Sequence, residues 1–168
     1  MDTKHTLIDK IKYFLETIGL KVEEGEIPES TFVPGIHILN GILWIDRSKL
    51  TYPGDLLHEA GHLALMEPEK RVEASGDLEP GNGITLNADS LEVGVILWTY
   101  AAIVELGIDP KIVFHDEGYR GASDWYIDTF SSGNYVGLPL LQWMGLCKNS
   151  DEISSILPFP HMIKWVRS

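Results

Sequence analysis

The chain has 168 residues, of which 44% are hydrophobic, and its formal net charge at pH 7 is −12 with histidine neutral. This length and composition predict a single globular domain with a substantial core. The 25 acidic residues outnumber the 13 basic ones, and the absence of a Lys/Arg cluster argues against nucleic acid or an anionic membrane as a partner.

Cysteine usage and the N-terminal residues indicate a cytoplasmic protein. Cys147 is the single cysteine, so no disulfide can form within the chain, as is usual in a reducing compartment. Residues 1–15 are charged throughout, unlike a secretory leader. The longest uncharged apolar stretch, residues 93–104, is too short to span a bilayer. The sequence leaves the oligomeric state open.

The first elements predicted along the chain are a helix, a loop and a hairpin. Residues 6–19 carry apolar side chains at helical spacing and end in a glycine, which predicts an amphipathic helix. Residues 23–29 are acidic and contain a proline, which predicts a loop. In residues 36–46, Asn40-Gly41 separates two runs that favour strands, so we expect a small antiparallel sheet.

The next element is an apolar segment that contains His58-Glu59-Ala60-Gly61-His62. On a helix, the two histidines lie on one face with roughly 5–6 Å between their Cβ atoms, so both rings can reach one ion at about 2.0–2.1 Å. Glu59 is rotated about 100° from His58, which places it near a metal-bound water as a general base. The spacing predicts a zinc site. The alternative is a core helix with two histidines, but buried imidazoles need polar partners.

The remaining predicted elements are mostly helical. Residues 67–87 are acidic, glycine-rich and aperiodic, which predicts a long surface loop or flap. Residues 89–106 predict a second buried helix that ends at Gly107. Residues 151–168 have no pattern that predicts an element. Short helices are predicted at residues 110–114, 122–130 and 138–146.

A site with two histidines needs a third protein ligand. The metzincin pattern requires a glycine three residues and a histidine six residues after His62, but Leu65 and Pro68 occupy these positions. The other common solution is a carboxylate from a following helix. Glu92 lies 30 residues after His62, at the start of the second buried helix.

In His58, Glu59, His62 and the spacing to Glu92, the chain resembles the gluzincin branch of zincin-like metallopeptidases. The resemblance implies one α+β zincin-like metal-binding domain over residues 1–168, mostly helical with a small antiparallel hairpin or sheet. It also implies a Zn²⁺ ion held by His58, His62 and Glu92, and a peptide or protein substrate.

Glu92 also fits a structural role. The spacing Asp89-Ser-Leu-Glu92 is that of a capping box, in which the residue at N3 bonds back to the N-cap amide. The ligand interpretation is favoured because Glu92 faces the predicted core, where an unpaired carboxylate is costly. The other candidates for the third ligand are Glu105, His115 and His161.

Residues 114–121 concentrate hydrogen-bonding groups between apolar helices. Tyr119, His115 and Arg120 are candidates to face the oxyanion that develops during amide hydrolysis. The alternative is a solvated loop with His115 near a helix C-terminus. The sequence thus predicts a zinc metallopeptidase or amide hydrolase with Glu59 as general base. The second hypothesis is a non-catalytic metal-binding protein whose zinc stabilises the fold or a partner interface.

Overall fold

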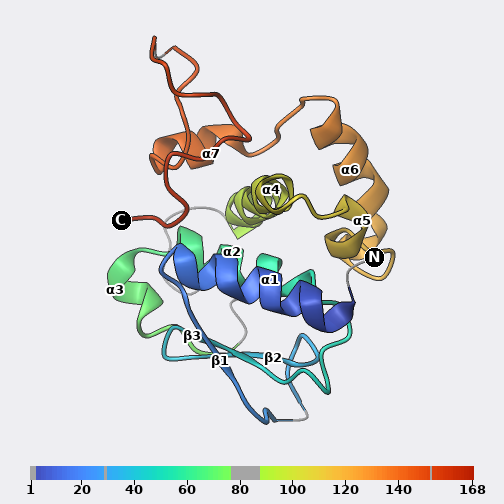
Figure 1. Ribbon diagram of the computed structural model, residues 1–168. Helices are drawn as coiled ribbons and strands as arrows, with labels where there is room; N and C mark the ends of the chain where they lie inside the picture. Colours follow the sequence, from blue (N-terminus) through green and yellow to red (C-terminus); the bar gives the residue numbers. More distant parts are fainter. Residues whose placement is uncertain (1–2, 29, 77–87, 152) are drawn as a thin grey trace. The chain divides into compact units, whose positions relative to one another are not determined.

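The computed structural model describes residues 3–28, 30–76, 88–151 and 153–168. The chain forms two compact units, the first from Met1–Glu79 with Val166–Ser168 and the second from Pro80–Trp165 (Figure 1). Helices dominate and the sheet is small, which confirms the predicted α+β class. The expectation of one zincin-like domain over the whole chain stays a prediction.

The first unit packs two helices against one face of a three-stranded sheet (Figure 1). Its elements are α1 (Lys4–Thr17), β1 (Lys21–Glu24), β2 (Ile36–Leu39), β3 (Ile42–Ile45), α2 (Asp55–Leu65) and α3 (Pro68–Arg71). Helix α1 confirms the amphipathic helix predicted over residues 6–19, and starts two residues earlier because Thr3 caps it through a 3.3 Å bond from the Thr6 amide. The buried face of α1 comprises Leu7, Ile8, Ile11, Phe14 and Leu15.

The predicted hairpin is present between β2 and β3. The strands pair antiparallel with Leu39 opposite Ile42, so Asn40 and Gly41 are the two turn residues. Their φ values are 51° and 72°, as a type I′ turn requires. The Gly41 amide donates to the Ala74 carbonyl at 2.9 Å, so the turn is also attached to the segment that follows α3.

Strand β1 corrects two of the sequence-based expectations. It pairs parallel with β3, so the sheet is mixed and its order is β1-β3-β2. Glu23 and Glu24 belong to this strand, whereas the sequence predicted a loop from residue 23. The local pattern hides the strand because Val22 is its one buried residue. Pairing with β3, a tertiary interaction, supplies its hydrogen bonds.

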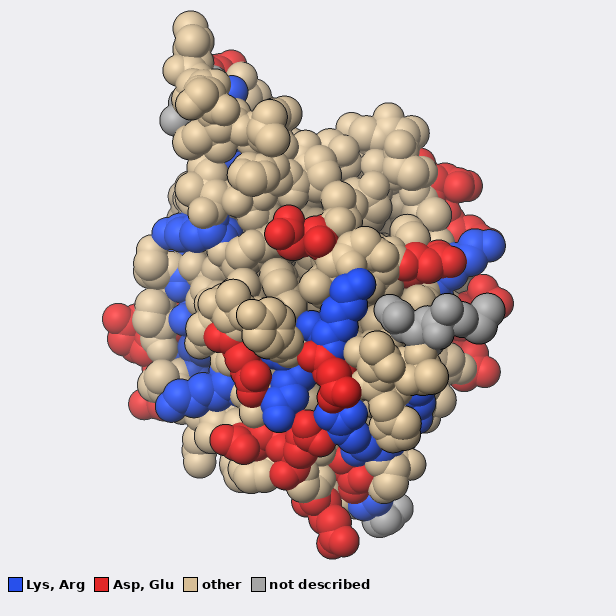
Figure 2. Space-filling view, viewed as in Figure 1, with Lys and Arg blue, Asp and Glu red and all other residues tan. Residues whose placement is uncertain are grey.

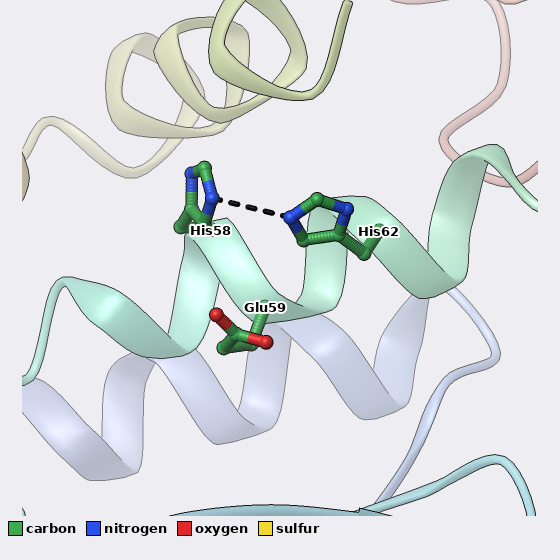
Figure 3. A group of neighbouring side chains, drawn as sticks. All are labelled: His58, Glu59 and His62. Atoms are coloured by element: carbon green, nitrogen blue, oxygen red, sulfur yellow. Dashed lines mark hydrogen bonds between the residues drawn. The ribbon is translucent and has the colours of Figure 1, made fainter. Parts of the chain in front are cut away.

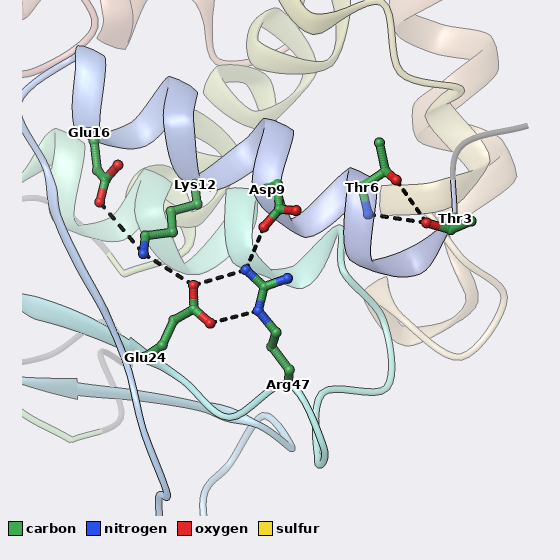
Figure 4. A network of polar contacts seen from close by, with 7 residues as sticks. All are labelled: Thr3, Thr6, Asp9, Lys12, Glu16, Glu24 and Arg47. Atoms are coloured by element: carbon green, nitrogen blue, oxygen red, sulfur yellow. Dashed lines mark hydrogen bonds and ion pairs between the residues drawn. The ribbon is translucent and has the colours of Figure 1, made fainter.

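A network of charged side chains joins α1, β1 and the segment after β3 (Figure 4). Arg47 donates to both carboxylate oxygens of Glu24, from Nε at 2.6 Å and from Nη2 at 2.9 Å, and Lys12 Nζ donates at 3.1 Å. Arg47 Nη2 also donates to Asp9 at 2.5 Å. The hydrogen bond from Arg47 is the main reason why the pKa of Glu24 falls from 4.5 to about 2, against the opposing effect of burial.

This network predicts a pH-dependent contribution to stability. A lowered folded-state pKa stabilises the fold above the unfolded value of 4.5, and the contribution is lost as the pH falls toward about 2. At pH 7, Arg47→Ala should lower the free energy of unfolding by about 1 kcal/mol, well below the full linkage value because solvent screens this partly exposed pair.

Urea unfolding of the wild type and of Arg47→Ala between pH 7 and pH 3 measures this effect. The difference between the two proteins should shrink below about pH 4.5. Lys21→Ala is the control, because it removes an exposed cation from β1, the strand that carries Glu24. It should show a smaller difference from the wild type, and that difference should not change with pH. A constant difference for Arg47→Ala across the range would contradict the role assigned to Glu24.

The second unit is built around α4 (Ala88–Leu106), which contacts α5 (Pro110–Val113) and α7 (Leu138–Trp143). The other elements are the 3₁₀ turn η1 (Tyr119–Gly121) and α6 (Ser123–Ser131). The Trp98 Nε1–H group of α4 donates to the Trp165 carbonyl at 2.8 Å and fixes residue 165 within this unit. None of the helices in the described parts of the chain combines the length and apolar character needed to cross a membrane.

Most helices of the second unit were predicted, with differences at their ends. Helices α4, α5 and α6 confirm the predictions at residues 89–106, 110–114 and 122–130 within two residues. Helix α7 ends at Trp143, before the predicted residue 146, because the chain turns at Gly145 with a φ of 69°. The prediction of a loop over residues 67–87 is wrong for residues 68–71, which form α3. Residues 77–87 of the predicted loop lie outside the described residues.

Candidate metal site

Helix α2 carries the two histidines on its least buried side. It begins directly after Pro53-Gly54, and Asp55 in its first turn interacts favourably with the helix dipole. The apolar side chains of α2 are buried, which fixes the helix in the first unit. His58 and Glu59 are half-buried, and His62 is 8% exposed. The helix therefore holds the imidazoles firmly and leaves the His58 end of the pair partly open to solvent.

The two imidazole rings face each other across one turn of α2 (Figure 3). Their Nε2 atoms lie 3.2 Å apart, and the ring planes are inclined at 80°. Two nitrogens that each lie about 2.0–2.1 Å from a tetrahedral zinc ion are themselves roughly 3.3 Å apart. The spacing of the Nε2 atoms therefore matches that of two ligands to one such ion.

The chemistry of the facing nitrogens also suits a cation. Two unprotonated Nε2 atoms at 3.2 Å would direct their lone pairs at each other, so a proton or a metal ion between them is favourable. Ligand atoms of His58, Glu59 and His62 all lie within 4.8 Å of one another. Figure 3 shows the Glu59 carboxylate on an adjacent side of α2, below the rings. The three residues form a cluster that could hold a metal ion.

The C-terminal end of α2 is held by arginines that sequence reasoning missed. Arg71 Nε donates to the Leu63 carbonyl at 2.7 Å, and Arg71 Nη2 donates to the Met66 carbonyl at 2.7 Å. The Arg167 amide donates to the Ala64 carbonyl at 2.8 Å. Burial lowers the pKa of Arg71, and the charge of Arg167 lowers it further. The proline and basic residues of segment 68–71 are typical of a short helix, but no local pattern reveals which carbonyls Arg71 would reach.

The other predicted site residues, Glu92, His115 and Tyr119, lie in the second unit. Glu92 is half-buried on the first turns of α4, and its negative charge adds to the effect of burial in raising the pKa of Tyr126. Glu92 as the third ligand stays a prediction. Asp89 lies in the first turn of α4, and the alternative capping box of Asp89 and Glu92 stays a prediction as well.

His115 and Tyr119 belong to the turn between α5 and α6. The His115 carbonyl accepts bonds from the Gly118 amide at 3.0 Å and from Ser123 Oγ at 2.7 Å, which closes the turn. Tyr119 has a φ of 53°, which is uncommon for a residue with a side chain, and its ring packs against Phe114 with 4.9 Å between centroids. A role for either residue in binding an oxyanion stays a prediction.

The other candidates for the third ligand or for an oxyanion donor, Arg120, Glu105 and His161, have exposed side chains. Arg120 is exposed in the same turn, and also has a left-handed backbone with a φ of 54°. Glu105 is exposed near the C-terminal end of α4, and His161 is exposed in the segment after α7. Exposure alone does not favour a ligand role for Glu105 or His161, because an exposed carboxylate or imidazole is stable in water without a metal.

Comparison of the chain with family models, curated proteins and solved structures gives no match. Any function must therefore be inferred from the geometry and chemistry of His58, Glu59 and His62.

Proposed function

We propose that the protein is a zinc-dependent peptidase or amide hydrolase. The observation that carries the proposal is the 3.2 Å separation of the His58 and His62 Nε2 atoms on one helix, with the carboxylate of Glu59 beside them. Imidazole nitrogens are common ligands of zinc, and a catalytic site combines three protein ligands with one open position. Glu92 is the proposed third ligand.

The carboxylate of Glu59 distinguishes this arrangement from a purely structural site. A bound zinc ion would lower the pKa of a water molecule to about 7 and polarise a carbonyl group. Glu59 would accept the proton of the attacking water as the new C–O bond forms. It would then deliver that proton to the departing amine nitrogen as the C–N bond breaks. His58 and His62 would keep their ring positions throughout, because the buried helix fixes them.

The proposed substrate is a peptide or protein with an accessible amide bond. His115 and Tyr119 are the proposed hydrogen-bond donors to the oxygen that becomes negatively charged during attack. Together with Glu59 they would supply the acid–base and electrostatic groups that amide hydrolysis needs.

Zinc loading provides the direct test of the proposed site. An ion that binds the folded chain stabilises it by mass action, by about 2.7 kcal/mol at a free concentration 100 times Kd. For a chain of this size, the melting temperature should rise by roughly 5–10 °C. Elemental analysis should find about one zinc per chain, and calorimetry with and without a chelator measures the shift.

His58→Ala is the control for this experiment, because it removes one ligand from the partly open end of the pair. Its melting temperature should be insensitive to zinc. Well under half an equivalent of zinc in the wild type after loading, together with an unchanged melting temperature, would overturn the proposed function.

A further inference from the structure

We propose that Arg71 is a positioning residue for the metal site, and this proposal rests on the proposed function. The hydrogen bonds from Arg71 go to the backbone carbonyls of Leu63, Met66 and Arg167, and not to a histidine ring. Arg71 acts on the backbone of α2 just beyond His62. Its proposed task is to keep the last helical turn intact so that the two Nε2 atoms stay at the separation that one metal ion requires.

The need for such a residue follows from where α2 ends. The helix runs from Asp55 to Leu65, so His62 lies in its last turn. The last four carbonyls of a helix have no partners within the helix, and an end without other partners frays. Fraying here would move His62 relative to His58, which is anchored one turn earlier.

The guanidinium group of Arg71 adds donors at this end of α2, where the Leu63 carbonyl also accepts from the amide of the C-cap residue Met66 at 3.3 Å. It donates to Leu63 and Met66 at 2.7 Å each, and its Nη2 atom also donates to the Arg167 carbonyl at 2.6 Å. The Arg167 amide in turn donates to the Ala64 carbonyl at 2.8 Å. The planar guanidinium fork thus binds three carbonyls together, which a single ammonium group cannot do with the same geometry.

The hairpin turn between β2 and β3 in turn holds Arg71 and its neighbours in place. Arg71 is the last residue of α3, and Gly41 of the hairpin turn packs so closely on the Arg71 carbonyl that a side chain at position 41 would collide with it. The Asn40 amide donates to Ser75 Oγ at 2.9 Å, four residues after Arg71. The hairpin turn therefore fixes α3, and α3 presents the guanidinium group to the end of α2.

Metal affinity of matched arginine variants tests the proposal. Arg71→Ala should weaken zinc binding roughly tenfold, at the lower end of the range for residues that orient metal ligands. Arg47→Ala is the control, because Arg47 is also a well-bonded arginine of the first unit but binds Glu24 and Asp9. It should lose stability and keep wild-type affinity. Arg71→Lys should recover only part of the affinity that Arg71→Ala loses.

Cobalt(II) in place of zinc gives a second readout that stability alone does not change. Its visible absorption reports the coordination geometry, so the spectrum should change in Arg71→Ala and match the wild type in Arg47→Ala. Wild-type affinity and spectrum in Arg71→Ala would overturn the proposal. If Arg71→Ala does not fold, wild-type affinity in Arg71→Lys overturns it and a partial loss supports it. A wild-type protein that binds no metal would overturn the proposed function as well.

Discussion

Glu59→Gln should lower the hydrolytic rate by roughly 10²–10⁴ while the metal stays bound. This is the usual contribution of a general acid–base group, and glutamine has almost the same shape as glutamate but cannot accept the proton of the attacking water. The substitution removes neither His58 nor His62, whose Nε2 atoms lie 3.2 Å apart in the unsubstituted protein. Rates measured on a peptide library or a casein substrate, with zinc content determined in parallel, give both quantities.

His58→Ala is the matched comparison for Glu59→Gln, because the two residues are neighbours on α2 and both are half-buried. His58→Ala should lose both metal and activity. Equal loss of metal in the two variants would mean that Glu59 is a ligand and not a base. Full retention of metal in Glu59→Gln, with a wild-type protein that hydrolyses no amide, would favour the non-catalytic metal-binding role.

The elements that the sequence predicts correctly are those whose determinants are local. The apolar spacing of α1 and the Asn40-Gly41 dipeptide each specify their element through nearby residues. Asparagine and glycine both tolerate the positive φ that the hairpin turn requires. Helix α4 contains the uncharged apolar stretch of residues 93–104, and Gly107 with a φ of 59° follows its last residue. These elements can be predicted without knowing which residues they contact in the folded protein.

The elements that were missed depend on contacts distant in the sequence. Strand β1 has three exposed residues out of four, and its stability comes from pairing with β3 and from the bonds between Glu24 and Arg47. Helix α3 is a single turn without a buried residue, and its place is set by the hairpin and by α2. Neither element has an apolar periodicity of its own, so charge and composition suggested loops.

In the candidate site, too, the features set by nearby residues could be predicted and those set by distant residues could not. His58, Glu59 and His62 fall within five residues, so helix geometry alone brings their ligand atoms together, and the structure contains this cluster. The support from Arg71 and Arg167 spans 96 residues of sequence and could not be predicted from a local pattern. The third ligand poses the same problem, since spacing along the chain does not determine distance in space.

Glu92→Gln should therefore have the largest effect on metal affinity of any substitution outside α2. If Glu92 is the third ligand, the change removes an anionic oxygen donor and should weaken zinc binding by more than the roughly 10–100-fold typical of residues that only orient ligands. Glutamine has nearly the same volume, so packing around α4 should be preserved. Competitive chelator titration of the purified wild type and variant measures the two affinities.

Glu105→Gln is the control on the same helix, because Glu105 is exposed near the opposite end of α4. It should bind zinc as the wild type does. If Glu92 has only a structural role near the start of α4, its replacement would leave metal affinity unchanged and alter stability by less than about 1 kcal/mol, mainly through the lost interaction with the helix dipole. Unchanged affinity in Glu92→Gln with a large loss in Glu105→Gln would move the ligand to the other end of α4. That result would remove the 30-residue spacing on which the resemblance to gluzincins depends.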